Sequence, residues 1–164
     1  METKHDFFRA NVGAVIFNNA GKVLACKRSD IDSEAWQLPQ GGIHVGELTL
    51  HAVYREIQEE VAIVQTDLVL LAEMAEWLAY ELPEPYRNAK TGRGQTQKWF
   101  LFRFVGSEDD IHPDAQEFTA WRWMELQALY DRVVTFRRPI YQRLLQEWTA
   151  YLGSRAISEI TIPH

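Results

Sequence analysis

One stretch of this chain limits the possible folds most: residues 48–61 carry apolar side chains at steps of three and four residues. The apolar positions are Leu50, Val53, Tyr54, Ile57 and Val61. At 3.6 residues per turn this spacing places them on one face, so the segment is predicted to be an amphipathic helix. Such a helix is stable only when another layer covers its apolar face, and the rest of the chain must supply that layer.

Strand-like segments surround the predicted helix. Residues 11–28 are predicted to form a hairpin, because two β-rich runs flank turn residues at 18–22. Residues 36–42 are expected to be a short strand that runs into a tight turn. Further strands are expected at 68–72, 77–80, 98–105 and 118–124.

The remaining segments complete the expected organisation. Residues 81–97 are polar and rich in Pro, Gly and charge, which is typical of a surface loop that carries binding residues. A second helix is expected to begin near Pro139. The chain is therefore predicted to be a single domain over residues 1–164, either an α+β fold or an α/β/α sandwich with a mixed sheet. Its core is expected at about 8–149, and 153–164 is expected to be a loose tail.

Composition excludes several classes of protein. The chain has 164 residues, a net charge of −6 and one cysteine, Cys26, so a disulfide framework and a four-cysteine zinc site are ruled out. The N-terminus lacks the apolar stretch of a signal peptide, and no apolar run is long enough to span a membrane. The acidic balance argues against binding to duplex DNA. We therefore expect a cytoplasmic protein that binds neither membranes nor duplex DNA.

The polar side of the predicted helix is acidic. Glu56, Glu59 and Glu60 lie at positions i, i+3 and i+4, so their carboxylates share an arc of about 100°. A solvated acidic surface is the simplest interpretation, because exposed like charges at this spacing cost only about 0.2–0.5 kcal/mol per pair. At a concave site the same carboxylates would instead repel strongly, and a divalent cation such as Mg²⁺ would relieve the repulsion.

The residues before the helix favour the second interpretation. The loop at 41–47 contains three glycines, which allow a tight turn, and Arg55 lies within reach of a carboxylate from that loop. A glycine loop against an acidic helix face is a plausible place for a complex of a metal with a polyphosphate.

The segment from Gly41 to Ile63 closely resembles the Nudix box. Gly41 is followed after five residues by Glu47, and after seven more by the run Arg-Glu-Ile-Gln-Glu-Glu-Val-Ala-Ile at 55–63. Ala62 stands where the box has its second glycine, so it departs from the pattern at the helix end. Every charged position of the box is present.

Further segments resemble one branch of this family, the bacterial RNA pyrophosphohydrolases and the similar diadenosine polyphosphate hydrolases of bacteria and plants. The segments lie at 9–13, 36–42, 95–100, 117–123 and 133–139. The resemblance covers about residues 8–149. It implies the Nudix fold, in which a mixed sheet lies between helices and the box forms a loop-helix-loop.

The resemblance also implies roles for individual residues. Glu56, Glu59 and Glu60 match metal ligands, and the carbonyl of Gly41 together with Glu117 completes the expected site for Mg²⁺, with Mn²⁺ as the alternative ion. Glu47 is expected to pair with Arg55 and so orient the helix. Either Glu56 or Glu60 is expected to take a proton from the attacking water, with a slight preference for Glu56.

Further residues match positions that contact substrate in this branch. Arg9, Arg28, Lys98 and Arg137 are candidates for binding phosphates, with ordinary surface charge as their alternative. Tyr80 is a candidate hydrogen-bond donor to a phosphate, or alternatively a half-buried strand tyrosine. Phe136 is a candidate for stacking on a base, or a core phenylalanine.

These implications converge on a Mg²⁺-dependent hydrolase of phosphoanhydride bonds in nucleoside 5′-polyphosphates. Two substrates fit: diadenosine tetraphosphate, split to ATP and AMP, and the 5′-triphosphate end of RNA, which would lose pyrophosphate. One alternative is a non-catalytic Nudix-fold sensor of nucleotides. Another is a housecleaning pyrophosphatase for damaged nucleoside triphosphates.

Overall fold

The computed structural model describes residues 6–29 and 35–149, so the tail predicted at 153–164 lies outside the described residues. The strands are β1 Phe8–Phe17, β2 Val23–Arg28, β3 Trp36–Gln37, β4 Gln40–Gly42, β5 Leu68–Glu73, β6 Leu78–Glu81, β7 Gly94–Phe104 and β8 Phe118–Met124. The helices are α1 Thr49–Val61, α2 Leu126–Arg132 and α3 Arg138–Trp148. Short 3₁₀ turns are η1 Gln65–Asp67, η2 Glu84–Tyr86, η3 Glu108–Asp110 and η4 Thr135–Arg137.

The strands form a mixed sheet around a central parallel pair. The sheet has the order β3-β2-β1-β7-β5, while β4 pairs with β1, β6 with β7 and β8 with β2. Strands β1 and β7 run parallel, in register from Phe8 opposite Gly94 to Phe17 opposite Arg103. The predicted hairpin is confirmed: β1 and β2 are antiparallel, and the side chain of Asn18 accepts hydrogen bonds from the amides of Ala20 and Lys22 in the turn.

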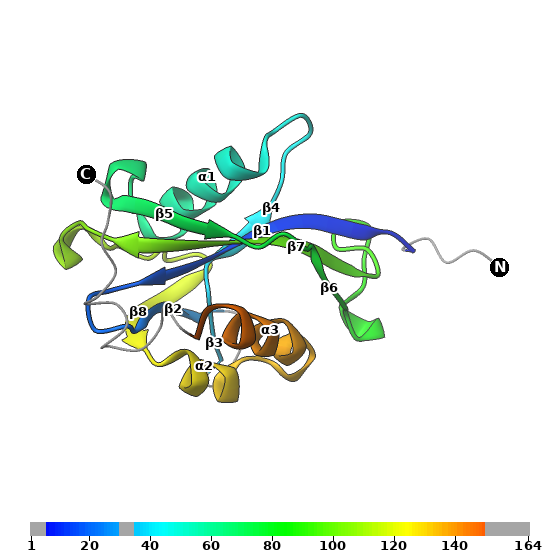
Figure 1. Cartoon of the computed structure of the whole chain (residues 1–164). Coiled ribbons are helices and arrows are strands. Elements are labelled where there is room, and N and C mark those ends of the chain that lie inside the picture. Colours follow the sequence, from blue (N-terminus) through cyan, green and yellow to red (C-terminus); the bar gives the residue numbers. More distant parts are fainter. Residues whose placement is uncertain (1–5, 30–34, 150–164) are drawn as a thin grey trace.

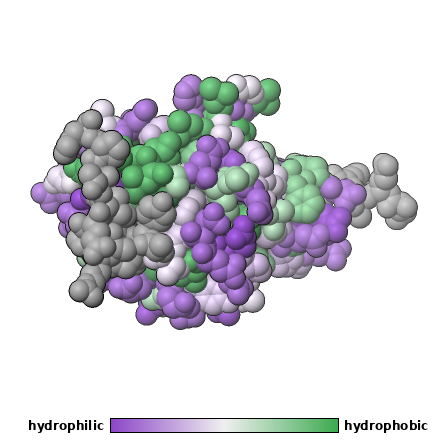
Figure 2. Space-filling view, viewed as in Figure 1, coloured by the Kyte–Doolittle hydropathy of each residue, from purple (hydrophilic) through white to green (hydrophobic). Residues whose placement is uncertain are grey.

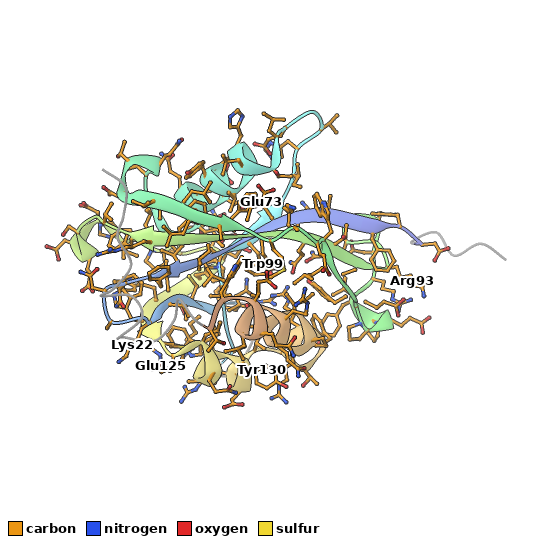
Figure 3. The ribbon with its side chains drawn as sticks, viewed as in Figure 1. Lys22, Glu73, Arg93, Trp99, Glu125 and Tyr130 are labelled. Atoms are coloured by element: carbon orange, nitrogen blue, oxygen red, sulfur yellow. The ribbon has the colours of Figure 1, made fainter. Side chains whose placement is uncertain are left out.

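Helices cover both faces of the sheet, as the sequence predicts. Helix α1 lies on one face, and α2 and α3 lie on the other (Figure 1). Side chains of β1 alternate between the two cores: Val12 packs with Ile57 of α1, whereas Val15 packs with Tyr141 of α3. The ring of Trp99 is fully buried between the sheet and α3, 6.3 Å edge-on from that of Tyr141 (Figure 3).

The helix predicted at 48–61 is α1, and its apolar face is in the core. Val53, Ile57 and Val61 are at most 1% exposed. The helix ends at Ala62, which has φ 64° and whose amide donates to the carbonyl of Gln58. This left-handed conformation costs an L-residue about 1–2 kcal/mol, so the missing box glycine changes the strain at the helix end and not its position.

Other predicted boundaries need correction. The strand expected at 98–105 begins at Gly94, because Gln95 and Gln97 pair with β1 on one side and β6 on the other. The loop expected at 81–97 therefore ends earlier. Helix α2 was not predicted, whereas α3 begins at Arg138 with Pro139 in its first turn, close to the predicted start.

The loop between β4 and α1 projects from the body of the protein (Figure 1). Val45, near its tip, is fully exposed, and hydrophobic atoms mark this loop on the surface (Figure 2). None of the described helices is long and apolar enough to cross a membrane.

Candidate active site

The glycine loop and helix α1 meet at strand β4. A Cβ atom at Gly41 would lie 2.0 Å from the carboxyl carbon of Glu56, so only glycine leaves room for that carboxylate against the strand. A Cβ at Gly42 would lie 2.1 Å from the guanidinium of Arg9. Because successive residues of a strand face opposite ways, β4 contacts the glutamates on one face of the sheet and Arg9 on the other.

Arg55 ties the loop to the helix. Its Nε and Nη2 donate to the two oxygens of Glu47 at 2.8 and 2.9 Å, and Nη2 also donates to the carbonyl of Gly42 at 2.8 Å. The hydrogen bonds from Arg55 lower the pKa of Glu47 to about 2. This paired fork fixes the position of the loop relative to α1, as expected for the two residues.

Arg55 also holds two of the box glutamates. Its Nη1 donates to Glu56 at 2.8 Å and to Glu59 at 3.1 Å. The Glu56 side chain is 14% exposed, whereas that of Glu59 is 56% exposed. The acidic face is therefore graded, with Glu59 at its outer edge.

Glu60 lies at the buried end of this face. It is 2% exposed, and its Oε2 accepts a hydrogen bond from the backbone amide of Gln40 at 3.2 Å. Its Oε1 has no hydrogen-bond partner among the residues that the structure describes. Burial, followed by the charges of Glu117 and Glu56, raises the pKa of Glu60. A buried carboxylate with an unpaired oxygen and acidic neighbours is costly unless a cation offsets it.

Glu117 reaches this region from the turn before β8. The side chain of Asp114 accepts from the amides of Gln116 and Glu117, at 2.6 and 3.2 Å, and the amide of Asp114 donates to the carbonyl of Glu60. Asp114 thus attaches the Glu117 turn to the end of α1. Asp114 is not among the residues predicted from the sequence, although an Asp three positions before Glu117 is a signal for such a turn.

These oxygen donors match the ligand chemistry of Mg²⁺, although they are not gathered into a finished site. Carboxylate and carbonyl oxygens are the ligands that hard divalent cations prefer. Among the described residues, Glu60 Oε1 makes no hydrogen bond and is therefore available as a metal ligand. Within 6–29 and 35–149 no three acidic, histidine or cysteine side chains form a cluster able to hold a metal. Arg55 explains this, since it binds oxygens of both Glu56 and Glu59.

On the opposite face, aromatic side chains gather around Arg137. The ring of Phe136 lies 5.9 Å from that of Tyr80 and 5.8 Å from that of Tyr86. The guanidinium of Arg137 lies 5.7 Å from the Phe136 ring and 5.9 Å from the Tyr80 ring. Tyr86, which is 61% exposed, is not among the site residues predicted from the sequence.

Arg137 itself is nearly buried, at 9% exposure. Its Nη1 donates to the side-chain oxygen of Gln37 at 2.5 Å, and its Nε has no hydrogen-bond partner in the described part of the chain. Among the described residues the structure records no carboxylate paired with it. A desolvated guanidinium without an anion has the character of an anion site.

The other predicted basic residues are spread over the sheet. Lys98 is held by Glu73 at 3.3 Å and by the carbonyl of Ala75 at 3.2 Å. Arg28 lies where a β-bulge interrupts the pairing of β2 with β8, and it is already engaged within the protein. Arg9 alone among these three lies directly against the glycine loop.

Comparison with known proteins identifies the family. The sequence matches the family described as "NUDIX domain" over residues 7–144. The chain belongs to the Nudix family. The relatives include proteins named RNA pyrophosphohydrolase. That of Acidiphilium cryptum is 45% identical over 153 residues, covering 88% of this chain and 92% of the relative. That of Rhodospirillum rubrum is 41% identical over 152 residues, covering 88% of each.

Solved structures support the Nudix fold. A binary complex of an Ap4A hydrolase from C. elegans superposes with a TM-score of 0.65 at 21% identity, covering 87% of this chain and 98% of that one. The dihydroneopterin triphosphate pyrophosphohydrolase of E. coli gives 0.68 at 23% identity, covering 86% and 99%. The predicted α/β/α arrangement is therefore confirmed as that of Nudix hydrolases.

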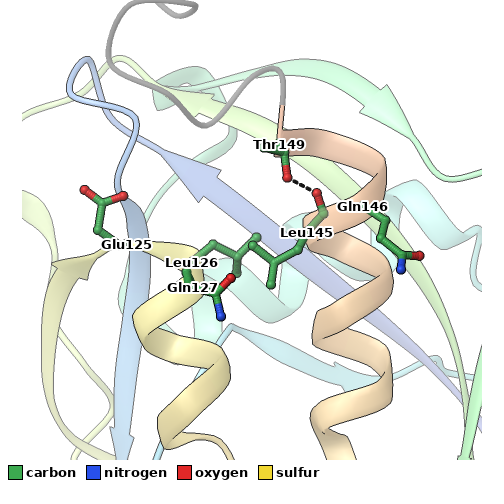
Figure 4. A pocket seen from close by; sticks show the side chains of 6 residues that line it. All are labelled: Glu125, Leu126, Gln127, Leu145, Gln146 and Thr149. Atoms are coloured by element: carbon green, nitrogen blue, oxygen red, sulfur yellow. Dashed lines mark hydrogen bonds between the residues drawn. The ribbon is translucent and has the colours of Figure 1, made fainter.

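A surface cavity elsewhere on this Nudix domain lies apart from Glu56, Glu59 and Glu60. It has a volume of about 360 Å³ and lies between α2 and α3 (Figure 4). Its lining consists of Glu125, Leu126, Gln127, Leu145, Gln146 and Thr149. The one charged side chain in this lining is acidic, which does not suit a polyphosphate.

Proposed function

We propose that this Nudix hydrolase cleaves phosphoanhydride bonds in nucleoside 5′-polyphosphates, with Mg²⁺ as cofactor and Mn²⁺ as the alternative ion. The observation that carries the proposal is a pair of unbalanced buried charges. Within 6–29 and 35–149, Glu60 has an unpaired oxygen on one face of the sheet, and Arg137 is in none of the ion pairs on the other. A metal–polyphosphate complex would supply a cation to the first and an anion to the second.

The proposed metal ligands are Glu56, Glu59, Glu60, Glu117 and the carbonyl of Gly41. When bound there, the cation supplies neutralisation of phosphate charge and a lowered pKa of bound water. Glu56 is the proposed proton acceptor, with Glu60 as the alternative. Its residual exposure supports this role, since water reaches a side chain that is 14% exposed more readily than one that is 2% exposed.

The proposed substrate contacts lie on both faces of the sheet. Arg137 and Arg9 bind phosphate oxygens, because the planar guanidinium can donate to two oxygens at once. Arg28 and Lys98 complete the basic set. Tyr80 would donate to a phosphate by turning its hydroxyl hydrogen away from the side-chain oxygen of Gln95, to which it donates in the structure. Phe136 stacks on a nucleobase, and its ring already lies in an aromatic group that could extend onto a base.

Two substrates fit this arrangement: diadenosine tetraphosphate and the 5′-triphosphate end of RNA. The relatives named RNA pyrophosphohydrolase support the second. Both share a 5′-linked polyphosphate, so one site serves both. We place the activity in a single domain that acts in the cytoplasm.

Charge-neutral replacement of the glutamates tests the proposal. Glu60→Gln and Glu59→Gln each remove one ligand charge, so turnover of either substrate should fall at least tenfold at saturating Mg²⁺. Glu125→Gln, on an exposed position at the start of α2, is the matched control and should keep the wild-type rate. If both site variants retained more than about a tenth of that rate, the ligand assignment would be wrong.

A further inference from the structure

Three glutamine side chains lie buried in the middle of the sheet. Gln40, Gln95 and Gln97 are 8%, 7% and 1% exposed. A buried amide that lacks hydrogen bonds costs about 1–3 kcal/mol, so the bonds of these amides determine how they lie.

Gln97 is the centre of this group. Its Nε2 donates to the side-chain oxygen of Gln40 at 3.0 Å and, more weakly, to that of Gln95 at 3.4 Å. Its Oε1 accepts from the indole nitrogen of Trp99 at 3.2 Å. The indole nitrogen can only donate, so it fixes which end of the Gln97 amide faces Gln40.

The bond from Gln97 to Gln40 joins two strands that do not pair with each other. Strand β1 lies between β7 and β4, with Gln97 opposite Asn11 and Gln40 opposite Gly13. A Cβ at Gly13 would lie 2.5 Å from the ring of Trp99, so the glycine leaves room over β1 for that ring, whose indole nitrogen donates to Gln97. The amides therefore cross the central strand directly.

Both ends of this chain of hydrogen bonds reach the proposed active site. At one end, the hydroxyl of Tyr80 donates to the side-chain oxygen of Gln95. At the other end, the backbone N–H of Gln40 donates to Oε2 of Glu60. The next residue in the chain is Gly41. The chain thus runs from the aromatic side of the sheet to the glutamate side.

We propose that Gln97 is a positioning residue for the reaction. By anchoring the side chain of Gln40 to β7 across β1, it fixes the backbone amide that binds Glu60 and the carbonyl of Gly41 beside it. The ligand geometry at Glu60 then depends on the side-chain amide of Gln97, which the weak bond to Gln95 connects to Tyr80 without placing Tyr80 itself. This inference rests on the proposed function, because it assigns Gln97 a role in that same reaction.

Gln97 could instead only stabilise the fold. A double variant distinguishes this structural role from the proposed positioning role. Gln97→Leu leaves the Gln40 amide unpaired, whereas Gln97→Leu with Gln40→Leu removes both partners and relieves part of that cost. If Gln97 only stabilises the fold, activity should recover together with the melting temperature. If it positions Gln40, the melting temperature should recover in part while kcat stays low.

The experiment measures kcat, KM and melting temperature for wild type and these variants, with a 5′-triphosphorylated oligonucleotide and saturating Mg²⁺. Binding of Mg²⁺ without substrate is followed by calorimetry. We expect Gln97→Leu to lower kcat at least tenfold, to leave KM within twofold and to weaken Mg²⁺ binding at least threefold. Gln127→Leu, on the exposed side of α2, should match wild type in all of these.

Three outcomes would overturn the inference. An unchanged kcat in folded Gln97→Leu would remove Gln97 from the reaction and leave the proposed function intact. Recovery of kcat to the wild-type value in the double variant would reduce its role to stability. A wild-type enzyme without turnover would overturn the proposed function and this inference together.

Discussion

Among the glutamates of the box, Glu60 is the most buried and lies near other acidic groups, so its charged form is the least favourable. Its neighbour Glu59, one position earlier, is on the surface and paired with Arg55. Glu60 is in the core, its carboxylate accepts a hydrogen bond from the backbone amide of Gln40, and burial followed by the charge of Glu117 raises its pKa. A buried carboxylate of this kind lowers the stability of the metal-free protein in exchange for binding a ligand, and the loss of stability can be measured.

The stability of the metal-free protein should therefore depend on pH through Glu60. A folded-state pKa above the usual 4.5 means that its protonated form favours folding. This contribution is present below pH 4.5 and is lost as pH rises through the folded pKa. Glu60→Gln should melt above wild type at pH 7 without metal, and addition of Mg²⁺ should raise the melting temperature of wild type only. A variant that melted lower than wild type at pH 7 would contradict this account of the burial.

The two faces of helix α1 have different roles, one in packing and one in the proposed site. The face with Ile57 closes the core under the sheet, while the face with Glu56 and Glu59 meets the loop. The helix does not depend on N-terminal capping, since no side chain caps it at Leu48. Packing of the apolar face is therefore what holds the glutamates in place.

Ile57→Asp should unfold the protein or lower its melting temperature far more than any glutamate variant. Ile57 is 0% exposed, and an unpaired buried carboxylate costs several kcal/mol out of a total stability of about 5–15 kcal/mol. Thermal unfolding followed by circular dichroism measures the effect. The matched variant Gln58→Asp, on the exposed neighbouring position, should melt within a few degrees of wild type.

The sequence predicted elements with strong periodicity and missed those whose role depends on tertiary contacts. Helix α1 and strand β8 follow their patterns closely. The start of β7 was missed because Gln95 and Gln97 are polar, yet both are buried by pairing between β1 and β6. Helix α2 has only seven residues, too few for a clear period. Burial of Glu60 was also hidden, because its spacing equals that of a solvated acidic face.

For the molecule as a whole, the sheet separates the acidic set from the aromatic group around Arg137, and strand β4 contacts both faces. Opposed sites of this kind suit a substrate that carries negative charge and bases together. The resemblance of Arg9 and Arg137 to phosphate-binding positions agrees with this arrangement. Their contribution can be tested separately from that of the metal.

Arg137→Met tests the basic side. Methionine keeps apolar bulk against Tyr80 and Phe136 and removes the charge, so kcat/KM for a polyphosphate substrate should fall tenfold or more, about 1.4 kcal/mol. Arg143→Met, on the part of α3 that faces Glu76 and Glu147, is the control and should leave kcat/KM unchanged. Equal values for the two variants would remove Arg137 from the substrate site.

The most direct measurement compares wild-type turnover of diadenosine tetraphosphate and of a 5′-triphosphorylated oligonucleotide, each at the same concentration, with Mg²⁺ and with a chelator. The account predicts hydrolysis of at least one substrate, to ATP and AMP or to pyrophosphate and a 5′-monophosphate end. It also predicts that the chelator abolishes turnover. Negligible rates on both substrates with Mg²⁺, or rates that survive the chelator, would contradict it.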